Sequence, residues 1–138
     1  MPSTLIGAVI PFDDAAFAGV VARDARIDKI AGGFGFVEGP KWTDDDGGYL
    51  LFSDIPNNRV HRWSPDHGVT VHRELSGNTN GNTRDGGGRL LSCEHSGRRV
   101  AVEDRAGIRE TVVDHYLGKR LNSPNDVVVR SDGTIWFT

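Results

Sequence analysis

The sequence predicts an all-β fold built from repeated small antiparallel sheets, as in a β-propeller. From residue 26 onward, short runs of β-branched and aromatic residues alternate with Gly, Asp, Asn and Pro clusters every eight to twelve residues, which is typical of strands joined by turns. The chain also repeats itself every 40 to 45 residues, which is the size of one propeller blade. Glycine makes up 18 of the 138 residues, nearly twice the usual share of roughly 7%. A chain so rich in turns and short strands indicates a meander of sheets.

The first 25 residues have a sequence pattern that differs from that of the repeats. Residues 11–24, PFDDAAFAGVVARD, predict a short amphipathic helix, because Asp13 can cap its start and Phe17, Val20 and Val21 share one face. We therefore divide the chain into a leader, 1–25, and the beginning of a propeller domain, 26–138. The apolar run at residues 5–12 is too short to span a bilayer and no Lys or Arg precedes it. These features predict a cytoplasmic protein without a membrane partner.

The internal repeat is visible in matched strands and turns. Residues 49–54 align with 89–94 at an offset of 40, and residues 88–91 align with 133–136 at an offset of 45. A turn rich in Asp and Gly precedes each matched strand. Two hairpins of any all-β protein can align by chance, since they share turn chemistry. Here the offset of 40 also holds across the next turn and strand, which favours a true repeat.

The repeats do not complete a closed propeller. From Glu38 the chain contains about two and a half of them, whereas propellers typically close with four to eight blades. The last residues, 134–138, are the middle of a predicted strand with no turn after it. We therefore expect this chain to be the N-terminal part of a longer propeller.

Charge and cysteine content exclude several classes of protein. Lys and Arg number 16 against 19 Asp and Glu, for a net charge of −3. A nucleic-acid partner is not expected, because a phosphate-binding face normally shows as a basic excess. The single cysteine, Cys93, excludes an internal disulfide and a multi-cysteine zinc site.

Polar residues at the starts of three first strands predict a functional site. In a propeller these strands line the central channel, and Glu38, Asn80 and Asn125 occupy equivalent places in them. One carboxylate and two amide oxygens suit a hard divalent cation such as calcium, magnesium or manganese. Such residues also commonly cap turns, but their recurrence in three repeats favours a site. His95, at the end of an inner strand, is a candidate substrate contact, and the other histidines have no metal-ligand spacing.

Several motifs carry a family resemblance. GFGFVEGPKW at 33–42, LLFSDIPNNRVHRW at 50–63, NGNTRDGGGRLLSCEHSGRRV at 80–100 and GKRLNSPNDVVVRSDGTIWFT at 118–138 resemble the SMP-30/gluconolactonase/LRE family, most of all its bacterial gluconolactonase branch. The resemblance covers about residues 26–138. It implies a six-bladed β-propeller that hydrolyses sugar lactones at a divalent metal in the central channel.

The resemblance also implies roles for single residues. The metal-binding Glu of the EGP motif falls on Glu38 and the Asn of the SPND motif on Asn125, while the substrate-contacting Asn of the second blade falls on Asn80. A substrate-binding Arg of the animal members is replaced by Asn78 here, which puts the animal substrate preference in doubt. The family's general-base Asp belongs to a later blade, so we expect it beyond Thr138 and assign no catalytic residue within this chain.

These observations predict a metal-dependent lactone hydrolase with a small-molecule lactone as its partner. A bound cation would polarise the lactone carbonyl as a Lewis acid while water attacks. The expected cofactor is calcium, with zinc, manganese or magnesium as alternatives. One rival hypothesis is a non-catalytic propeller that serves as a binding scaffold, which would not need Glu38. Another is that these residues alone form an inactive fragment of the lactonase.

Overall fold

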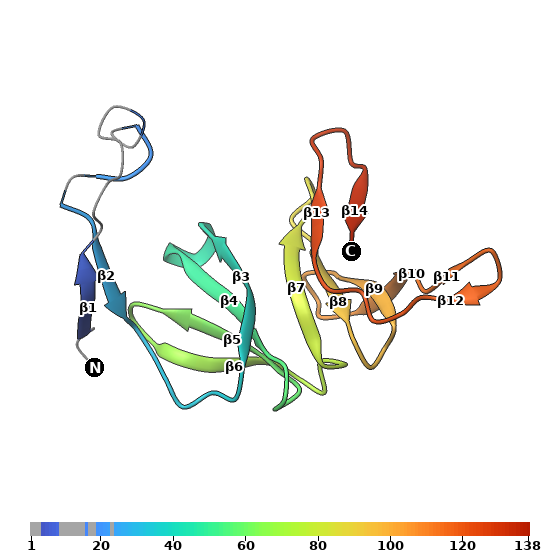
Figure 1. Cartoon of the computed structure of the whole chain (residues 1–138), viewed down its shortest axis with the longest axis horizontal. Helices are drawn as coiled ribbons and strands as arrows, with labels where there is room; N and C mark the ends of the chain where they lie inside the picture. The colour runs from blue at the N-terminus through green and yellow to red at the C-terminus, as the bar shows by residue number, and fades with distance from the viewer. Residues whose placement is uncertain (1–3, 9–15, 17–18, 23) are drawn as a thin grey trace. The chain divides into compact units, whose positions relative to one another are not determined.

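The computed structural model describes residues 4–8, 16, 19–22 and 24–138, which form two compact units, residues 1–33 and residues 34–138 (Figure 1). In the first unit, β1 (Thr4–Ala8) pairs antiparallel with β2 (Arg26–Lys29). The helix predicted over residues 11–24 lies largely outside the described residues. The boundary predicted after residue 25 stays a prediction.

Two four-stranded antiparallel sheets form most of the second unit. Blade 1 consists of β3 (Val37–Thr43), β4 (Tyr49–Asp54), β5 (Arg59–Ser64) and β6 (Gly68–Glu74), in that order across the sheet. Blade 2 consists of β7 (Thr79–Arg84), β8 (Leu90–Glu94), β9 (Arg99–Glu103) and β10 (Arg109–Val113), again in chain order. A short 3₁₀ turn, η1 (Asp45–Gly47), links β3 to β4. Both sheets are meanders of neighbouring strands, and the predicted all-β class and blade-sized period are confirmed.

A third sheet begins after a small extra hairpin. The hairpin pairs β11 (His115–Tyr116) with β12 (Lys119–Arg120), and it is followed by the antiparallel pair β13 (Val127–Val129) and β14 (Ile135–Phe137). Figure 1 shows the hairpin projecting from the loop that leads from β10 to β13. The repeat in the sequence gives no indication of this hairpin, because it is an insertion between two repeating units.

The repeat extends to the backbone conformation of the turns. Asn58 and Arg98, 40 residues apart, both have positive φ values, of 54° and 50°. Asn78 and Ser123, 45 residues apart, share values of 51° and 47°. Left-handed backbone is uncommon for residues other than glycine, so its recurrence at the two offsets of the sequence alignment indicates equivalent turns.

Two clusters of buried apolar residues lie between the sheets. Leu51 and Val60 of blade 1 pack with Leu90 of blade 2, whereas Leu91 and Cys93 of blade 2 pack towards the third sheet. Successive side chains of a strand point to opposite faces, so neighbouring residues of β8 serve different cores. Cys93 is fully buried, and burial raises the pKa of its thiol to about 12. It packs as a small apolar residue.

The first strands of successive sheets lie side by side. The N–H of Gly81 on β7 donates to the carbonyl oxygen of Asn125, at 2.8 Å. A Cβ atom on Gly39 of β3 would lie 2.1 Å from the carbonyl oxygen of Asn80, and one on Gly81 would lie 2.7 Å from the Cα of Asp126. Only glycine permits such close approaches of backbone. Within the described residues, no helix has the length and hydropathy needed to cross a membrane.

Candidate functional site

The predicted site residues lie at one end of the sheets, where the first strands begin. The register of β3 against β4 shifts between Glu38 and Lys41, and that of β7 against β8 shifts between Thr79 and Asn82. Glu38 and Asn80 therefore occupy the same irregularity in successive blades. Asn125 directly precedes β13, and its N–H donates to the carbonyl oxygen of Thr138 at 2.6 Å.

The two predicted metal ligands present free oxygens. Glu38 and Asn125 are both exposed, and neither side chain makes a hydrogen bond or ion pair with another described residue. Glu38 lies at a strand irregularity that recurs in blade 2, and a carboxylate without a partner among the described residues is not explained by turn capping. Its oxygens remain available to a ligand outside the chain.

The two predicted substrate-binding residues contact each other. Asn80 Nδ2 lies 3.3 Å from His95 Nε2, although the two residues belong to different strands and turns. Asn80 is 7% exposed, and His95 is half-buried. The carbonyl oxygen of Asn80 accepts a hydrogen bond from Ser53 Oγ of blade 1 at 2.8 Å. The structure thus brings these two side chains together, while their role in binding stays a prediction.

A buried amide that sequence reasoning missed lies two residues after Asn80. Asn82 is 6% exposed, and its Nδ2 donates to Ser53 Oγ at 2.8 Å and to two carbonyl oxygens, those of Gly39 and Asn80. Its Oδ1 accepts from Ser92 Oγ at 2.9 Å. Asn82 therefore ties the start of β7 to blade 1. The alternation Asn-Gly-Asn in a first strand was the available signal, because residues two apart share a face.

A buried acid ends the second strand of each blade. Asp54, at the end of β4, accepts hydrogen bonds from the backbone N–H groups of Gly35 and Phe36 at 3.2 and 3.3 Å and from Asn57 Nδ2 at 2.8 Å. Burial raises the pKa of Asp54, but these hydrogen bonds and the nearby His61 outweigh it and hold the pKa below its ordinary value. Asp54 thereby fastens the segment that leads into β3 and to Glu38.

Glu94 occupies the equivalent position in blade 2 and uses different partners. It is 2% exposed, and it pairs with Arg99 Nε at 2.7 Å and with Arg109 Nη1 at 3.1 Å. The hydrogen bond that Arg99 donates to Glu94 raises the pKa of Arg99. In blade 2 the neutral Asn80 takes the place that the charged Glu38 has in blade 1. The negative charge of the buried Glu94 is compensated by two arginines.

Comparison with known proteins identifies the fold and the family. The family model of the SMP-30/gluconolactonase/LRE-like region matches residues 36–138. The chain belongs to this family. It is 32% identical over 152 residues to a gluconolactonase of Zymomonas mobilis, which covers all of this chain and 42% of the relative.

Solved structures agree with this assignment. A gluconolactonase of Xanthomonas campestris superposes with a TM-score of 0.86 at 37% identity, over all of this chain and 46% of that one. Virginiamycin B lyase of Staphylococcus aureus superposes with a TM-score of 0.63 at 17% identity, over 85% of this chain and 39% of the lyase, a likeness of fold alone. These are propeller proteins, so the chain forms part of a β-propeller. It spans less than half the length of the gluconolactonases that it matches.

The side chain of Asn78 forms hydrogen bonds within the loops of the protein. The resemblance places Asn78 where the animal members of the family have an arginine. Its Nδ2 donates to the carbonyl oxygen of Ile55 at 2.7 Å, and its Oδ1 accepts from Ser96 Oγ. Both polar atoms of the side chain are therefore used within the protein. The substrate preference of the protein stays a prediction.

The donor set at the strand starts fits part of a coordination shell. The described residues contain no group of three or more His, Cys, Asp and Glu side chains that could hold a metal ion. The oxygens present are the carboxylate of Glu38 and the side-chain amide oxygen of Asn125, which are hard donors of the kind that calcium and magnesium prefer. Their chemistry fits a divalent cation, and other donors would have to complete the shell.

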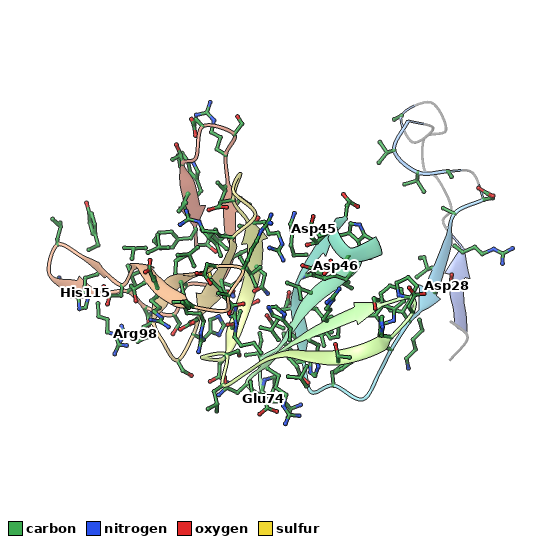
Figure 2. The ribbon with its side chains drawn as sticks, turned by 180° about the vertical axis from the view of Figure 1, so that it is seen from behind. Asp28, Asp45, Asp46, Glu74, Arg98 and His115 are labelled. Atoms are coloured by element: carbon green, nitrogen blue, oxygen red, sulfur yellow. The ribbon has the colours of Figure 1, made fainter. Side chains whose placement is uncertain are left out.

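A charged cleft of about 840 Å³ lies elsewhere, between blades 1 and 2. It is lined by the β3–β4 turn with Asp45 and Asp46 (Figure 2) and by the β9–β10 turn, which are at the opposite end of the strands from Glu38. Its Arg84 donates to Tyr49 Oη at 2.6 Å and to Thr43 Oγ1 at 3.1 Å. Since this guanidinium is already bound within the protein, we assign no function to the cleft.

Proposed function

We propose that the whole protein hydrolyses a sugar lactone with the help of one divalent cation, held in part by Glu38 and Asn125. Two kinds of observation support this proposal. The chain belongs to the SMP-30/gluconolactonase/LRE-like family, and two gluconolactonases are its relatives in sequence and structure. The observation that carries the site is the recurrence of Glu38, Asn80 and Asn125 at the starts of three neighbouring first strands.

The reaction consumes one water. The water oxygen adds to the lactone carbonyl carbon, the bond between that carbon and the ring oxygen breaks, and the ring oxygen takes up a proton to become a hydroxyl group. The product is a hydroxy acid, which releases a proton at neutral pH. No covalent bond to the protein is needed, in keeping with Cys93, whose thiol is fully buried and has its pKa raised to about 12.

Each residue has a distinct part in this scheme. A divalent cation, when bound, polarises the lactone carbonyl and lowers the pKa of water. Glu38 supplies negative charge to hold the ion, whereas Asn125 supplies a neutral oxygen that leaves the ion's charge available. Asn80 and His95, which contact each other at 3.3 Å, offer polar groups that orient the hydroxyl groups of the sugar. The general base stays a prediction for a later blade.

The decisive experiment separates metal binding from substrate binding in the full-length protein. Glu38→Gln removes one charge at nearly constant shape, so we expect metal affinity to fall about tenfold or more, together with lactone hydrolysis. Asn80→Ala should bind the metal like the parent but show a raised KM. Calorimetric titration with calcium, zinc, manganese and magnesium, combined with an assay on gluconolactone, measures both.

Glu110→Gln is the matched control, because Glu110 is exposed on β10, away from the first strands. It should titrate and turn over like the parent. If Glu38→Gln binds every metal as tightly as the parent, the metal assignment is wrong. A full-length protein that binds metal and hydrolyses no lactone would favour the binding scaffold instead.

A further inference from the structure

Two arginines from distant parts of the sequence each donate a hydrogen bond to the backbone of the loop that carries the other. Arg98 lies on the turn between β8 and β9, and its Nε donates to the carbonyl oxygen of Leu121 at 2.6 Å. Arg120, at the end of β12, donates from Nη2 to the carbonyl oxygen of Gly97 at 2.9 Å. We call Arg98 and Arg120 the rim pair. Figure 2 shows Arg98 on the same side of the molecule as His115 of the β11–β12 hairpin.

The positive charges of the rim pair are only weakly compensated. Other arginines of the two blades pair with carboxylates: Arg99 and Arg109 with Glu94, and Arg73 with Glu103. Both rim arginines instead donate to neutral carbonyl groups, and Arg98 has no carboxylate partner among the described residues.

The acid whose charge interacts with that of Arg120 is already hydrogen-bonded to another side chain. Asp114 is hydrogen-bonded to His115 at 2.9 Å. That bond is the main cause that holds the pKa of Asp114 below its ordinary value, and the charge of Arg120 contributes less. Lys119, next to Arg120 and exposed, adds a further positive charge. The surface around the rim pair therefore carries an excess of positive charge, although the net charge of the protein is −3.

The rim pair lies beside the predicted substrate contacts. The N–H of Arg98 donates to the carbonyl oxygen of His95 at 3.2 Å, and Ser123 Oγ donates to the same oxygen at 3.2 Å. The ring of His95 in turn contacts Asn80. The segment that carries Arg120 and Ser123 leads directly to Asn125 at the start of the third sheet. The rim pair is thus connected by single hydrogen bonds to the turn that presents His95.

We propose that the rim pair binds an anionic group on the substrate, so that the preferred lactone carries a phosphate or a carboxylate. A guanidinium has five N–H donors, and the bond to a carbonyl oxygen uses one of them, which leaves others to bind an oxyanion in the bidentate geometry that arginine favours. Because each arginine is already held by the opposite loop, less conformational entropy is lost on binding. This inference rests on the proposed lactone hydrolysis.

The test compares three lactones on the full-length protein: gluconolactone, the same lactone phosphorylated on its terminal carbon, and the same lactone with that carbon oxidised to a carboxylate. We expect kcat/KM for at least one anionic lactone to exceed that for the neutral one about tenfold, as for one charge-assisted contact. Whichever anionic lactone is preferred identifies the group. Arg98→Gln and Arg120→Gln should each lower this ratio several-fold, and Arg98→Lys should retain more of it than Arg98→Gln.

Arg130→Gln is the control, because Arg130 pairs with Asp132 on the turn between β13 and β14, at the other end of the strands, and its ratio should equal that of the parent. A parent that prefers the neutral lactone, or a ratio unchanged in both rim variants, would overturn the rim assignment and leave lactone hydrolysis intact. If the parent hydrolyses none of the three lactones, the proposed function fails. Calorimetric titration with inorganic phosphate then tests whether the rim pair binds an anion. Loss of phosphate binding in Arg98→Gln supports the anion site, and unchanged binding contradicts it.

Discussion

At the scale of single residues, glycine determines how closely successive sheets approach. Gly39 and Gly81 follow directly after the predicted site residues Glu38 and Asn80, and each faces the backbone of the next first strand. Their missing side chains make room for the carbonyl groups of Asn80 and Asn125. The strand starts that carry the predicted site residues can therefore lie close together because the residues after Glu38 and Asn80 are glycines.

We expect Gly81→Ala to destabilise the protein by about 2 kcal/mol or more, as other overpacked sites do. The added methyl group would lie 2.4 Å from Asp126 Oδ1 and 2.8 Å from the carbonyl oxygen of Asn125, and the second contact is with backbone that cannot rotate away. Gly86→Ala is the control, since nothing lies within 4 Å of its added carbon. Urea denaturation of both variants measures the difference, and equal midpoints would refute the close approach.

At the scale of elements, each blade uses a buried acid at the end of its second strand to hold a neighbouring segment. Asp54 binds the segment before β3 through backbone N–H groups, whereas Glu94 holds two arginines of its own sheet. The acid at this position of the repeat therefore binds different partners in the two blades. In blade 1 it positions the chain ahead of Glu38.

Asp54 should make the protein sensitive to acid. Its pKa in the folded state lies below the ordinary 3.8, so its stabilising effect is complete above about pH 5 and is lost as the pH falls through 3.8 to the folded value. Asp54→Asn should cost roughly 1–3 kcal/mol at pH 7 and should flatten the loss of stability between pH 5 and pH 3. Chemical denaturation over this pH range measures both effects. Asp66→Asn, at an exposed turn, is expected to retain the parent's profile, and an equal profile in Asp54→Asn would contradict the prediction.

At the scale of the whole propeller fragment, polar contacts between sheets supplement two small apolar cores. Asn82 of blade 2 donates to Gly39 and Ser53 of blade 1 while accepting from Ser92 of its own sheet. A buried amide with every polar atom bonded stabilises one arrangement of the sheets over others, since a shifted arrangement would leave these groups unpaired. The position of Asn80 depends on this contact.

Asn82→Asp should therefore weaken the interface between blades 1 and 2. A carboxylate would place negative charge against the carbonyl oxygens of Gly39 and Asn80, which accept from the amide in the parent. We expect a loss of about 2–4 kcal/mol in the free energy of unfolding at neutral pH, measured by denaturant unfolding. Asn122→Asp, at an exposed position without a side-chain partner among the described residues, should change stability by less than about 0.5 kcal/mol. Equal losses in the two variants would show that Asn82 has no special role.

The sequence by itself determined the fold class, the repeat and the places of the candidate site residues. Strand alternation and turn chemistry are local properties, so residues 49–54 and 89–94 could be matched before any contact was known. The same local pattern placed Glu38, Asn80 and Asn125 at equivalent positions in successive units. The resemblance of the motifs to a known family then suggested roles for those positions, and these roles stay predictions.

Only the tertiary structure decided which side chains meet. The structure joins segments 15 or more residues apart through the contact of Asn80 with His95 and through the bonds of Asn82 to blade 1. It also joins them through the bonds from Arg98 to Leu121 and from Arg120 to Gly97. In the sequence Arg98 and Arg120 each stand next to another basic residue, Arg99 and Lys119, a pattern that is typical of a solvated surface. Such contacts depend on how whole sheets pack and on an inserted hairpin outside the repeat, and neither the period of a strand nor the chemistry of a turn encodes them.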